Sequence, residues 1–302
     1  MDGAAVGRFA PSPSGPLHFG SVTSAVASYL NVRAQRGRWL LRIDDLDPPR
    51  EEAGAADAII RTLEALGLHW DGAIVYQSQR LAQYRAALEK LTAAGQTFIC
   101  TCSRRQVGPG AYPGTCRGKC STSPSTGSVR VLVGDEATSF TDLLHGDCDF
   151  RLTDECGDFI VQRADGLTAY HLAVVVDDAA AGVTEVVRGG DLLDSTPRQI
   201  HLQKLLGFKH PRYAHLPVVL GGNGVKLSKQ SHAQAIKPEH APLAVFHALV
   251  FLGFTPPAEL HGAAPCELLD WGLRVWRLDA VTPLSRSYPV MFADANMARS
   301  SV

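Results

Sequence analysis

The stretch RFAPSPSGPLHFGSVTSAVASYL, residues 8–30, decides how this chain begins to fold. Its first residues complete an apolar segment that predicts a short strand over residues 6–10. From Gly20 onward the apolar residues fall on one face of a helix, and Gly37 ends the pattern. A loop rich in proline and serine joins the two. The stretch therefore predicts a strand, a loop and a helix, in that order.

The composition is typical of a globular protein. The 302 residues are 45% hydrophobic, enough for one large domain or two ordinary ones with a sizeable core. The sequence has no run of about 18 apolar residues and no secretory signal, which predicts a cytoplasmic protein with no membrane partner. A formal net charge of -1 gives no global attraction to nucleic acid. Local basic clusters could supply one, although mixed charge of this kind is more typical of solvated surface: Arg33, Arg36 and Arg38, then Arg104, Arg105, Arg117 and Lys119.

Strand and helix patterns continue to alternate after residue 37. RWLLRID (38–44) predicts a second buried strand, and two helical patterns follow it, ending at Gly67 and Gly95. Further along, FIVQRADGLTAYHLAVVVDD predicts strand or buried helix, and DSTPRQIHLQKLLG predicts a helix capped by Ser195 or Thr196. This alternation indicates βαβ units and a parallel sheet, with a ligand at the carboxyl ends of the strands where their order reverses.

The patterns also predict how the chain divides. After residue 96 the alternation breaks into a stretch rich in Cys, Gly and Pro, which indicates an inserted module. Four parts are predicted: 1–96, the first half of a nucleotide-binding catalytic domain; 97–183, an inserted subdomain with a zinc loop at 100–120; 184–235, the second half of the catalytic domain; and 236–302, a helical C-terminal segment.

The loop before the first helix has the chemistry of a phosphate site. A helix N-terminus offers free N–H groups and the positive end of the helix dipole, both of which suit phosphate. Gly20 would let a base or ribose approach the backbone, and His18 adds a donor beside the phosphates. A plain turn with a histidine satisfied in the core is the alternative.

A second basic segment, VKLSKQ at residues 225–230, follows the glycine-rich LGGNG. Lys226 and Lys229 could wrap a triphosphate and match the charge that builds up as pyrophosphate leaves. The spacing of GGNGVKLS does not fit a P-loop, and a solvated loop is the alternative for this segment alone.

Together, PLHFGS and VKLSKQ resemble the HIGH and KMSKS signatures of class I aminoacyl-tRNA synthetases. RFAPSPSGPLHFGS and LLRIDDLDPPRE resemble the glutamyl-tRNA synthetase family more narrowly. VVRGGDLLDSTPRQIHLQKLLG and HLPVVLGGNGVKLSK extend the similarity from about residue 6 to about residue 255. The resemblance implies a Rossmann-like parallel sheet with an inserted acceptor-binding subdomain, and a reaction that joins glutamate to ATP, with Mg²⁺, before transfer to tRNA.

The resemblance also implies site residues. The glutamate site would consist of Arg8, Ala10, Ser12, Asp44, Tyr170 and Arg188; the ATP site of His18, Gly20, Ser21 and Lys229; and the catalytic residues would be His18, Lys226 and Lys229. Arginine pairs bidentately with carboxylates, and an acid suits the ammonium group, so these residue types fit glutamate. Two positions depart from the family: Asp44 stands where it usually has Glu, and Ser21 replaces the last His of HIGH.

Four of the seven cysteines gather in CTCSRRQVGPGAYPGTCRGKC, residues 100–120. Thiolates at this spacing in a Gly- and Pro-rich loop could close a structural Zn²⁺ site, or the cysteines could be incidental. The segment resembles the zinc module of a shortened branch of the family, in which a tyrosine is the fourth ligand. This implies the ligands Cys100, Cys102, Tyr112 and Cys116, with Cys120 as a competitor for the place of Tyr112.

The length after Gln230 favours the same branch. Only 72 residues follow, whereas a further anticodon-binding domain usually needs roughly 100 or more. We therefore expect no anticodon-binding domain and, by resemblance, attachment of glutamate to the queuosine base of tRNA(Asp) by a monomer. The alternatives are conventional glutamylation of a tRNA 3′ end, a noncatalytic RNA-binding relative, and a zinc-ribbon binding module, which would leave both phosphate signatures unexplained.

Overall fold

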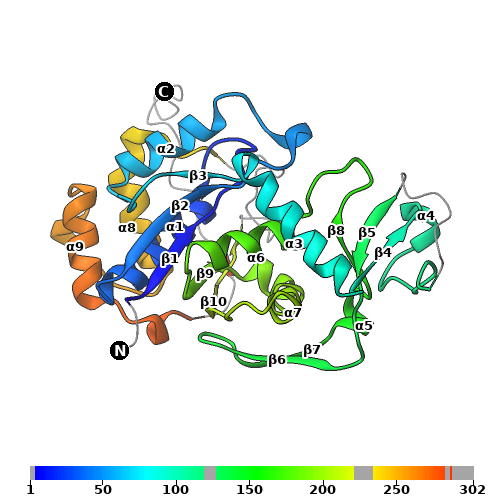
Figure 1. Cartoon of the computed structure of the whole chain (residues 1–302). Coiled ribbons are helices and arrows are strands. Elements are labelled where there is room, and N and C mark those ends of the chain that lie inside the picture. The colour runs from blue at the N-terminus through cyan, green and yellow to red at the C-terminus, as the bar shows by residue number, and fades with distance from the viewer. Residues whose placement is uncertain (1–3, 119–126, 221–233, 283–285, 288–302) are drawn as a thin grey trace, which may run out of the picture.

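A parallel sheet forms the centre of the protein (Figure 1). The structure is a computed structural model, and it describes residues 4–118, 127–220, 234–282 and 286–287. The strand order is β3-β2-β1-β9-β10-β6-β7, in which only β6 and β7 pair antiparallel. The strands are β1 (Val6–Phe9), β2 (Arg38–Ile43), β3 (Val75–Tyr76), β6 (Ala137–Asp142), β7 (Gly146–Arg151), β9 (Glu185–Gly189) and β10 (Arg212–Leu216). The predicted Rossmann-like parallel sheet is confirmed.

Helices cover both faces of this sheet, and they belong to two large hydrophobic cores. The helices are α1 (Phe19–Ala34), α2 (Ala55–Ala65), α3 (Leu81–Ala93), α6 (Tyr170–Ala180), α7 (Thr196–Leu206), α8 (Ala241–Phe251) and α9 (Pro265–Val275). One core joins β1 and β2 to α1, α2, α8 and α9, and the other joins α3, α6 and α7 to a smaller sheet. No helix in the described part of the chain has the length and apolar character needed to cross a bilayer.

The smaller sheet is antiparallel, with the order β4-β5-β8, and lies at the right of Figure 1. It consists of β4 (Thr97–Cys100), β5 (Ser128–Val131) and β8 (Phe159–Gln162), with the short helices α4 (Arg104–Val107) and α5 (Leu152–Glu155) nearby. All of these fall within the predicted inserted part, 97–183, but β6 and β7 of the same part pair with the main sheet. The predicted domain boundaries stay a prediction.

Close packing of α1 against β1 fixes where the first loop points. A Cβ atom at Gly7 would lie 2.3 Å from Val32 Cγ2, so only glycine permits this approach. On the neighbouring strand, Trp39 is fully buried and its Nε1 donates a hydrogen bond of 3.0 Å to Ser28 Oγ on α1. The N-terminus of α1 is thereby held at the carboxyl end of β1, as the stretch at residues 8–30 predicts.

The remaining elements lie after β10. Strand β11 (Val219–Leu220) pairs in parallel with β12 (Arg286–Ser287). Between them lie α8 and α9, which agree with the helical C-terminal segment predicted over residues 236–302. A short 3₁₀ helix, Leu278–Ala280, follows α9, and residues 288–302 lie outside the described part.

Candidate functional site

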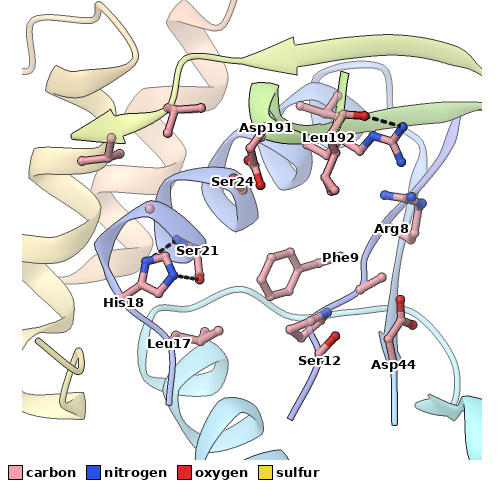
Figure 2. Close-up of a pocket in the computed structure, with 18 of the residues that line it drawn as sticks. Arg8, Phe9, Ser12, Leu17, His18, Ser21, Ser24, Asp44, Asp191 and Leu192 are labelled. Carbon is pink, nitrogen blue, oxygen red and sulfur yellow. Dashed lines mark hydrogen bonds between the residues drawn. The ribbon is translucent and has the colours of Figure 1, made fainter. Parts of the chain in front are cut away.

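A pocket of about 290 Å³ opens at the carboxyl ends of β1, β2, β9 and β10. It spans the boundary between β1 and β9, where the strand order reverses, which is the place that the sequence predicts for a ligand. Figure 2 shows His18 and Ser21 at one end of the pocket and Arg8 and Asp44 at the other. Its lining includes every described residue of the predicted glutamate and ATP sites: Arg8, Ala10, Ser12, His18, Gly20, Ser21, Asp44, Tyr170 and Arg188.

His18 caps the N-terminus of α1 with its own side chain. Its Nδ1 accepts a hydrogen bond from the backbone N–H of Ser21 at 3.3 Å, and its Nε2 lies 3.2 Å from Ser21 Oγ. Because Nδ1 is an acceptor, the proton of a neutral ring sits on Nε2 and is donated to Ser21 Oγ. The serine in the last place of the HIGH pattern thus holds the histidine ring in position.

Gly20 leaves room for that ring. A Cβ atom at this position would lie 3.2 Å from His18 Cε1 and 3.3 Å from Nδ1. Val219, on β11, approaches the same point at 3.8 Å. A side chain at residue 20 would therefore press on the imidazole and narrow the mouth of the pocket.

The two flanks of segment 221–233 both lie beside His18. Val219 precedes the segment and lines the pocket. Beyond it, Ile236 donates a backbone hydrogen bond of 2.9 Å to Leu17, and Ala235 forms a β-bridge with His18. Lys226 and Lys229 themselves lie outside the described residues. Chain segments separated by more than 200 residues in sequence therefore meet at the end of the pocket that His18 occupies.

Arg8 points its guanidinium into the other end of the pocket. Its Nε donates to both carboxylate oxygens of Asp178 at 3.2 Å, and within the described part of the chain its two Nη atoms have no hydrogen-bond partner. The side chain is buried apart from the pocket surface. Arg8 can therefore offer a pair of parallel N–H donors to a carboxylate while Asp178 balances its charge.

Asp44 is held by Arg42, a residue that the sequence reasoning missed. Arg42 donates from Nε to Asp44 Oδ1 at 2.6 Å and from Nη2 to Oδ2 at 3.3 Å, and its Nη1 reaches Asp178 Oδ1 at 2.6 Å. Burial raises the pKa of Asp44, and Arg42 opposes that effect. A charged residue inside the apolar run RWLLRID was the available signal, since buried arginines need partners.

Two adjacent acids on α6, Asp177 and Asp178, complete this buried group and were also missed. Asp177 accepts hydrogen bonds from Gln77, Arg80 and Tyr84 at 2.8, 2.5 and 2.8 Å. Although burial alone would raise the pKa of Asp178, the neighbouring arginines hold it below its usual value. The signal was the pair of acids that ends the apolar run AVVVDD. Three arginines and three aspartates thus pair beside the pocket: Arg8, Arg42 and Arg80 with Asp44, Asp177 and Asp178.

Arg188, on β9, is buried and already makes four hydrogen bonds within the protein. Its Nε donates to His215 Nε2 at 3.0 Å, and its Nη1 to Gln199 Oε1 at 2.9 Å. Its Nη2 donates to Thr196 Oγ1 at 2.8 Å and to the carbonyl of Leu192 at 3.3 Å. A guanidinium has five N–H donors, and these four hydrogen bonds use four of them. Arg188 therefore offers the pocket its positive charge and one remaining donor.

The remaining contacts of α6 and α7 refine two predictions. Tyr170 begins α6 at the pocket rim and is 39% exposed, so its ring is accessible to a ligand. Ser195 is the N-cap residue of α7 but makes no side-chain capping bond. The hydroxyl of Thr196, which follows it, is instead used by Arg188 and lies 3.1 Å from His215 Nε2.

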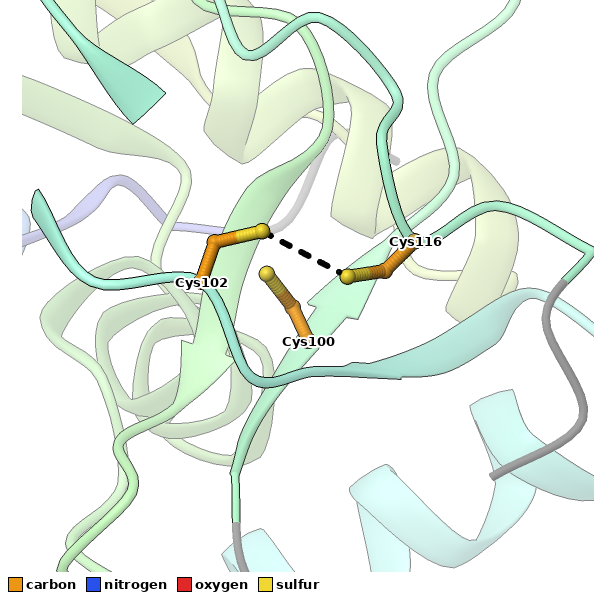
Figure 3. A group of neighbouring side chains, drawn as sticks. All are labelled: Cys100, Cys102 and Cys116. Carbon is orange, nitrogen blue, oxygen red and sulfur yellow. Dashed lines mark hydrogen bonds between the residues drawn. The ribbon is translucent and has the colours of Figure 1, made fainter. Parts of the chain in front are cut away.

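A second candidate site lies in the smaller sheet, where three thiols converge (Figure 3). The sulfur atoms of Cys100, Cys102 and Cys116 all lie within 4.8 Å of one another, and those of Cys102 and Cys116 are 3.5 Å apart. Two sulfur ligands of a tetrahedral zinc ion are separated by about 3.8 Å, given Zn–S bonds of about 2.3 Å. The three thiols therefore fit a zinc ion.

Tyr112 lies against the same thiols. Its hydroxyl accepts hydrogen bonds from the backbone N–H of Cys116 at 2.8 Å and from Cys100 Sγ at 3.4 Å. Hydrogen bonding by Tyr112 lowers the pKa of the Cys116 thiol to about 6, which favours the thiolate that a metal needs. The guanidinium of Arg130 stacks 3.9 Å above the ring of Tyr112. Cys120, the competing ligand, lies outside the described residues.

The parallel sheet, the histidine at the start of α1 and the strand-end pocket define the catalytic domain of a class I aminoacyl-tRNA synthetase. The family model "tRNA synthetases class I (E and Q), catalytic domain" matches residues 5–108 and 118–264. The chain belongs to this family and, within it, to the branch of glutamyl-Q tRNA(Asp) synthetases, and it is an aminoacyl-tRNA-synthetase-like ligase.

Two curated relatives place it in that branch. The glutamyl-Q tRNA(Asp) synthetase of Ectopseudomonas mendocina is 51% identical over 278 residues, covering 91% of this chain and 94% of the relative. That of Thiobacillus denitrificans is 52% identical over 286 residues, covering 92% and 95%. A solved glutamate tRNA ligase from Elizabethkingia meningosepticum, in complex with its amino acid, has the same fold with a TM-score of 0.78. It is 23% identical and covers 95% of this chain and 67% of that one.

Proposed function

We propose that this enzyme activates L-glutamate with ATP and transfers the glutamyl group to the queuosine base of tRNA(Asp). In the first step an α-carboxylate oxygen of glutamate attacks the α-phosphorus of ATP, which forms glutamyl-adenylate and releases pyrophosphate. In the second step a hydroxyl of the queuosine cyclopentenediol attacks the adenylate carbonyl. An ester forms, AMP leaves, and the hydroxyl proton passes to the phosphate of the departing AMP.

The observation that carries the proposal is the meeting of residues 235 and 236 with Leu17 and His18 at the pocket. It supports an ATP site in which His18, Gly20 and Ser21 at the start of α1 bind the phosphates. Because the flanks of segment 221–233 adjoin that site, Lys226 and Lys229 are proposed to stabilise the negative charge of the leaving pyrophosphate. Mg²⁺, which arrives with ATP, would neutralise part of the same charge.

The opposite end of the pocket supports glutamate as the amino acid. The two Nη atoms of Arg8 would bind one carboxylate bidentately, and the charge of Arg188 would favour it further. Asp44 would accept hydrogen bonds from the ammonium group of glutamate, directly or through a water molecule. We propose that Tyr170, at the rim, closes over the bound amino acid, while Ala10 and Ser12 line the wall between the two ends of the pocket.

The thiol cluster supports a structural Zn²⁺ ion held by Cys100, Cys102, Tyr112 and Cys116. Such an ion would order the loop between β4 and β5, which has a very small apolar core of its own. The names of the relatives support queuosine in tRNA(Asp) as the acceptor. A tRNA substrate also fits the predicted cytoplasmic location, and we propose that the enzyme acts as a monomer.

Transfer of labelled glutamate to purified tRNA(Asp) tests the proposal. We expect tRNA(Asp) with queuosine to accept glutamate, and tRNA(Asp) without queuosine and bulk tRNA(Glu) not to accept it. Removing the 3′-terminal adenosine from the queuosine-bearing tRNA should leave acceptance unchanged, because the acceptor hydroxyls lie in the anticodon loop.

Two alternatives predict different results. Conventional glutamylation of a 3′ end would be abolished by removing the terminal adenosine and would proceed without queuosine. A noncatalytic RNA-binding relative would fail to exchange labelled pyrophosphate into ATP when glutamate and tRNA(Asp) are both present. Either result would refute transfer to queuosine.

A further inference from the structure

Three side chains on neighbouring strands form a buried chain of hydrogen bonds that ends in the pocket. Asp142 is the last residue of β6, His215 lies on β10, and Arg188 lies on β9. Strand β10 lies between the other two, and its His215 is paired in register with Arg188. All three side chains are at least 95% buried. Asp142 Oδ2 lies 2.6 Å from His215 Nδ1, and His215 Nε2 lies 3.0 Å from Arg188 Nε.

The donors in this chain determine the protonation of the histidine. Arginine Nε–H can only donate, so His215 Nε2 must accept and carries no proton. The ring proton therefore sits on Nδ1 and is donated to Asp142. Asp142 is itself fixed, because its Oδ1 accepts the backbone N–H groups of Leu144 and His145 at 3.0 Å. Each group thereby orients the next, from the strand end to the guanidinium.

The surroundings of His215 support the same neutral form. Its ring stacks on Tyr213 with centroids 6.2 Å apart, and Arg188 lies over the same tyrosine. The side chain of His145 lies with its Nε2 3.0 Å from the backbone carbonyl of His215. Burial lowers the pKa of His215, and the positive charge of Arg188 lowers it further. The carboxylate of Asp142 acts in the opposite direction, but the pKa of His215 stays below its usual value.

We propose that Asp142 and His215 are positioning residues for Arg188, which they orient toward the carboxylate of the bound amino acid. The proposal rests on the function proposed above. Neither residue touches the pocket, whose lining includes Arg188 but not Asp142 or His215. Because Asp142 belongs to residues 97–183, the part predicted as an insertion takes part in forming the amino acid site through β6.

The substitution Asp142→Asn tests this chain with almost no change in shape. The Asn oxygen would stay with the two backbone N–H groups, so its NH₂ group would face His215 Nδ1. The ring would then move its proton to Nε2, where it would point at the Nε–H of Arg188. We expect the dissociation constant for glutamate, measured by calorimetry on the full chain, to rise at least tenfold, and that for ATP to stay within twofold.

Three further variants separate positioning from general stability. His215→Gln keeps an acceptor in the place of Nε2, so we expect it to recover most of the glutamate affinity that His215→Ala loses. His201→Gln is the matched control, because the half-buried ring of His201 hydrogen-bonds to the backbone carbonyl of Leu132 and packs on Phe159, away from the pocket. We expect it to bind glutamate and ATP as the parent does.

Histidine ¹⁵N NMR reports the tautomer of His215 without any ligand, with its signals assigned by their loss in His215→Gln. We expect the proton on Nδ1 in the parent and on Nε2 in Asp142→Asn. The proposal is overturned if Asp142→Asn binds glutamate within twofold of the parent, or if ATP binding weakens equally. If the parent binds no glutamate, the proposed function itself fails, and the NMR result still shows whether the hydrogen-bond chain forms.

Discussion

At the scale of single residues, the end of the pocket that Arg8 and Asp44 line depends on buried charges that compensate one another. Arg42 touches both Asp44 and Asp178, and Arg8 touches Asp178, so each carboxylate is paired before any ligand arrives. Removing one member of such a pair leaves an uncompensated buried charge. The same charges would be available to a zwitterionic amino acid, because its carboxylates and ammonium group match them in sign.

Replacing Asp44 by Asn should therefore affect stability as well as binding. We expect the free energy of unfolding, measured with urea, to fall by about 3 kcal/mol, because Arg42 loses its nearest carboxylate in a buried setting. Affinity for glutamate should fall in the same variant. Asp279→Asn is the matched control: Asp279 pairs with Arg277 at an exposed position and should leave the stability unchanged. Equal stabilities for the two variants would contradict the assignment.

A methyl group at Gly20 should act on ATP rather than on glutamate. The new Cβ would lie 3.2 Å from His18 Cε1 and push the imidazole away from the helix end. We expect kcat/KM for ATP in pyrophosphate exchange to fall by about 100-fold, since misplacing a catalytic group by about 1 Å has effects of that size. Gly134→Ala serves as the control, because a Cβ there meets nothing within 4 Å. An unchanged kcat/KM in Gly20→Ala would argue against the role of His18.

The sequence identified the pocket residues that belong to recognisable motifs, but not the buried residues that hydrogen-bond to them and hold them in position. Arg8, His18 and Arg188 were predicted, and all three line one pocket. Arg42, Asp178 and His215 were not, because each has a partner on another strand or helix, up to 170 residues away in the sequence. Charged residues in apolar runs signal that a partner exists. They do not identify it, because pairing depends on strand order.

At the scale of secondary structure, the sequence predicts where α1 begins, but it does not predict the sheet to which β6 belongs. The start of α1 follows from local signals, namely a glycine, a polar loop and a helical repeat, and the structure confirms them. Strands β6 and β7 lie within residues 97–183, the predicted inserted part, yet they extend the main sheet. Nothing local distinguishes an edge strand of one sheet from a strand of another, since both alternate in the same way.

The loop between β4 and β5 offers a test of the proposed zinc ligands. We expect Tyr112→Phe to lose most of the bound zinc, since its hydroxyl lies against the thiols, and Cys120→Ala to retain about one zinc ion per chain. Zinc content is measured by atomic absorption after dialysis. Cys102→Ala should lose zinc in any case and provides the positive control. Full retention in Tyr112→Phe together with loss in Cys120→Ala would assign the fourth ligand to Cys120.

At the scale of the whole molecule, α6 carries a neutral histidine where it packs against the smaller sheet. His171 is half-buried beside Phe159 of β8, and its buried Nδ1 has no hydrogen-bond partner in the described part of the chain. Burial, with Arg198 and Arg188 nearby, lowers its pKa to about 3. In the unfolded chain the pKa is about 6.5, so the unfolded state takes up a proton first as the pH falls. The contribution of His171 to stability is complete above pH 6.5 and is lost progressively down to about pH 3.

The variant His171→Gln should therefore resist mild acid better than the parent does. Between pH 7 and pH 5 we expect the parent to lose about 2 kcal/mol more in its free energy of unfolding than the variant, as measured with urea. The exposed His69 provides the control, and His69→Gln should lose as much as the parent. Identical losses in the parent and in His171→Gln would show that His171 does not stay neutral in the folded protein.

The contact of Ile236 with Leu17 has a consequence for the two lysines of segment 221–233. Whatever arrangement that segment takes, the covalent chain ties Lys226 and Lys229 to the mouth of the pocket from both sides. A group on so short a tether has an effective concentration on the order of millimolar, whatever the concentration of the enzyme. A small primary amine added to a Lys229→Ala variant would thus have to reach about that concentration before it could replace the missing side chain.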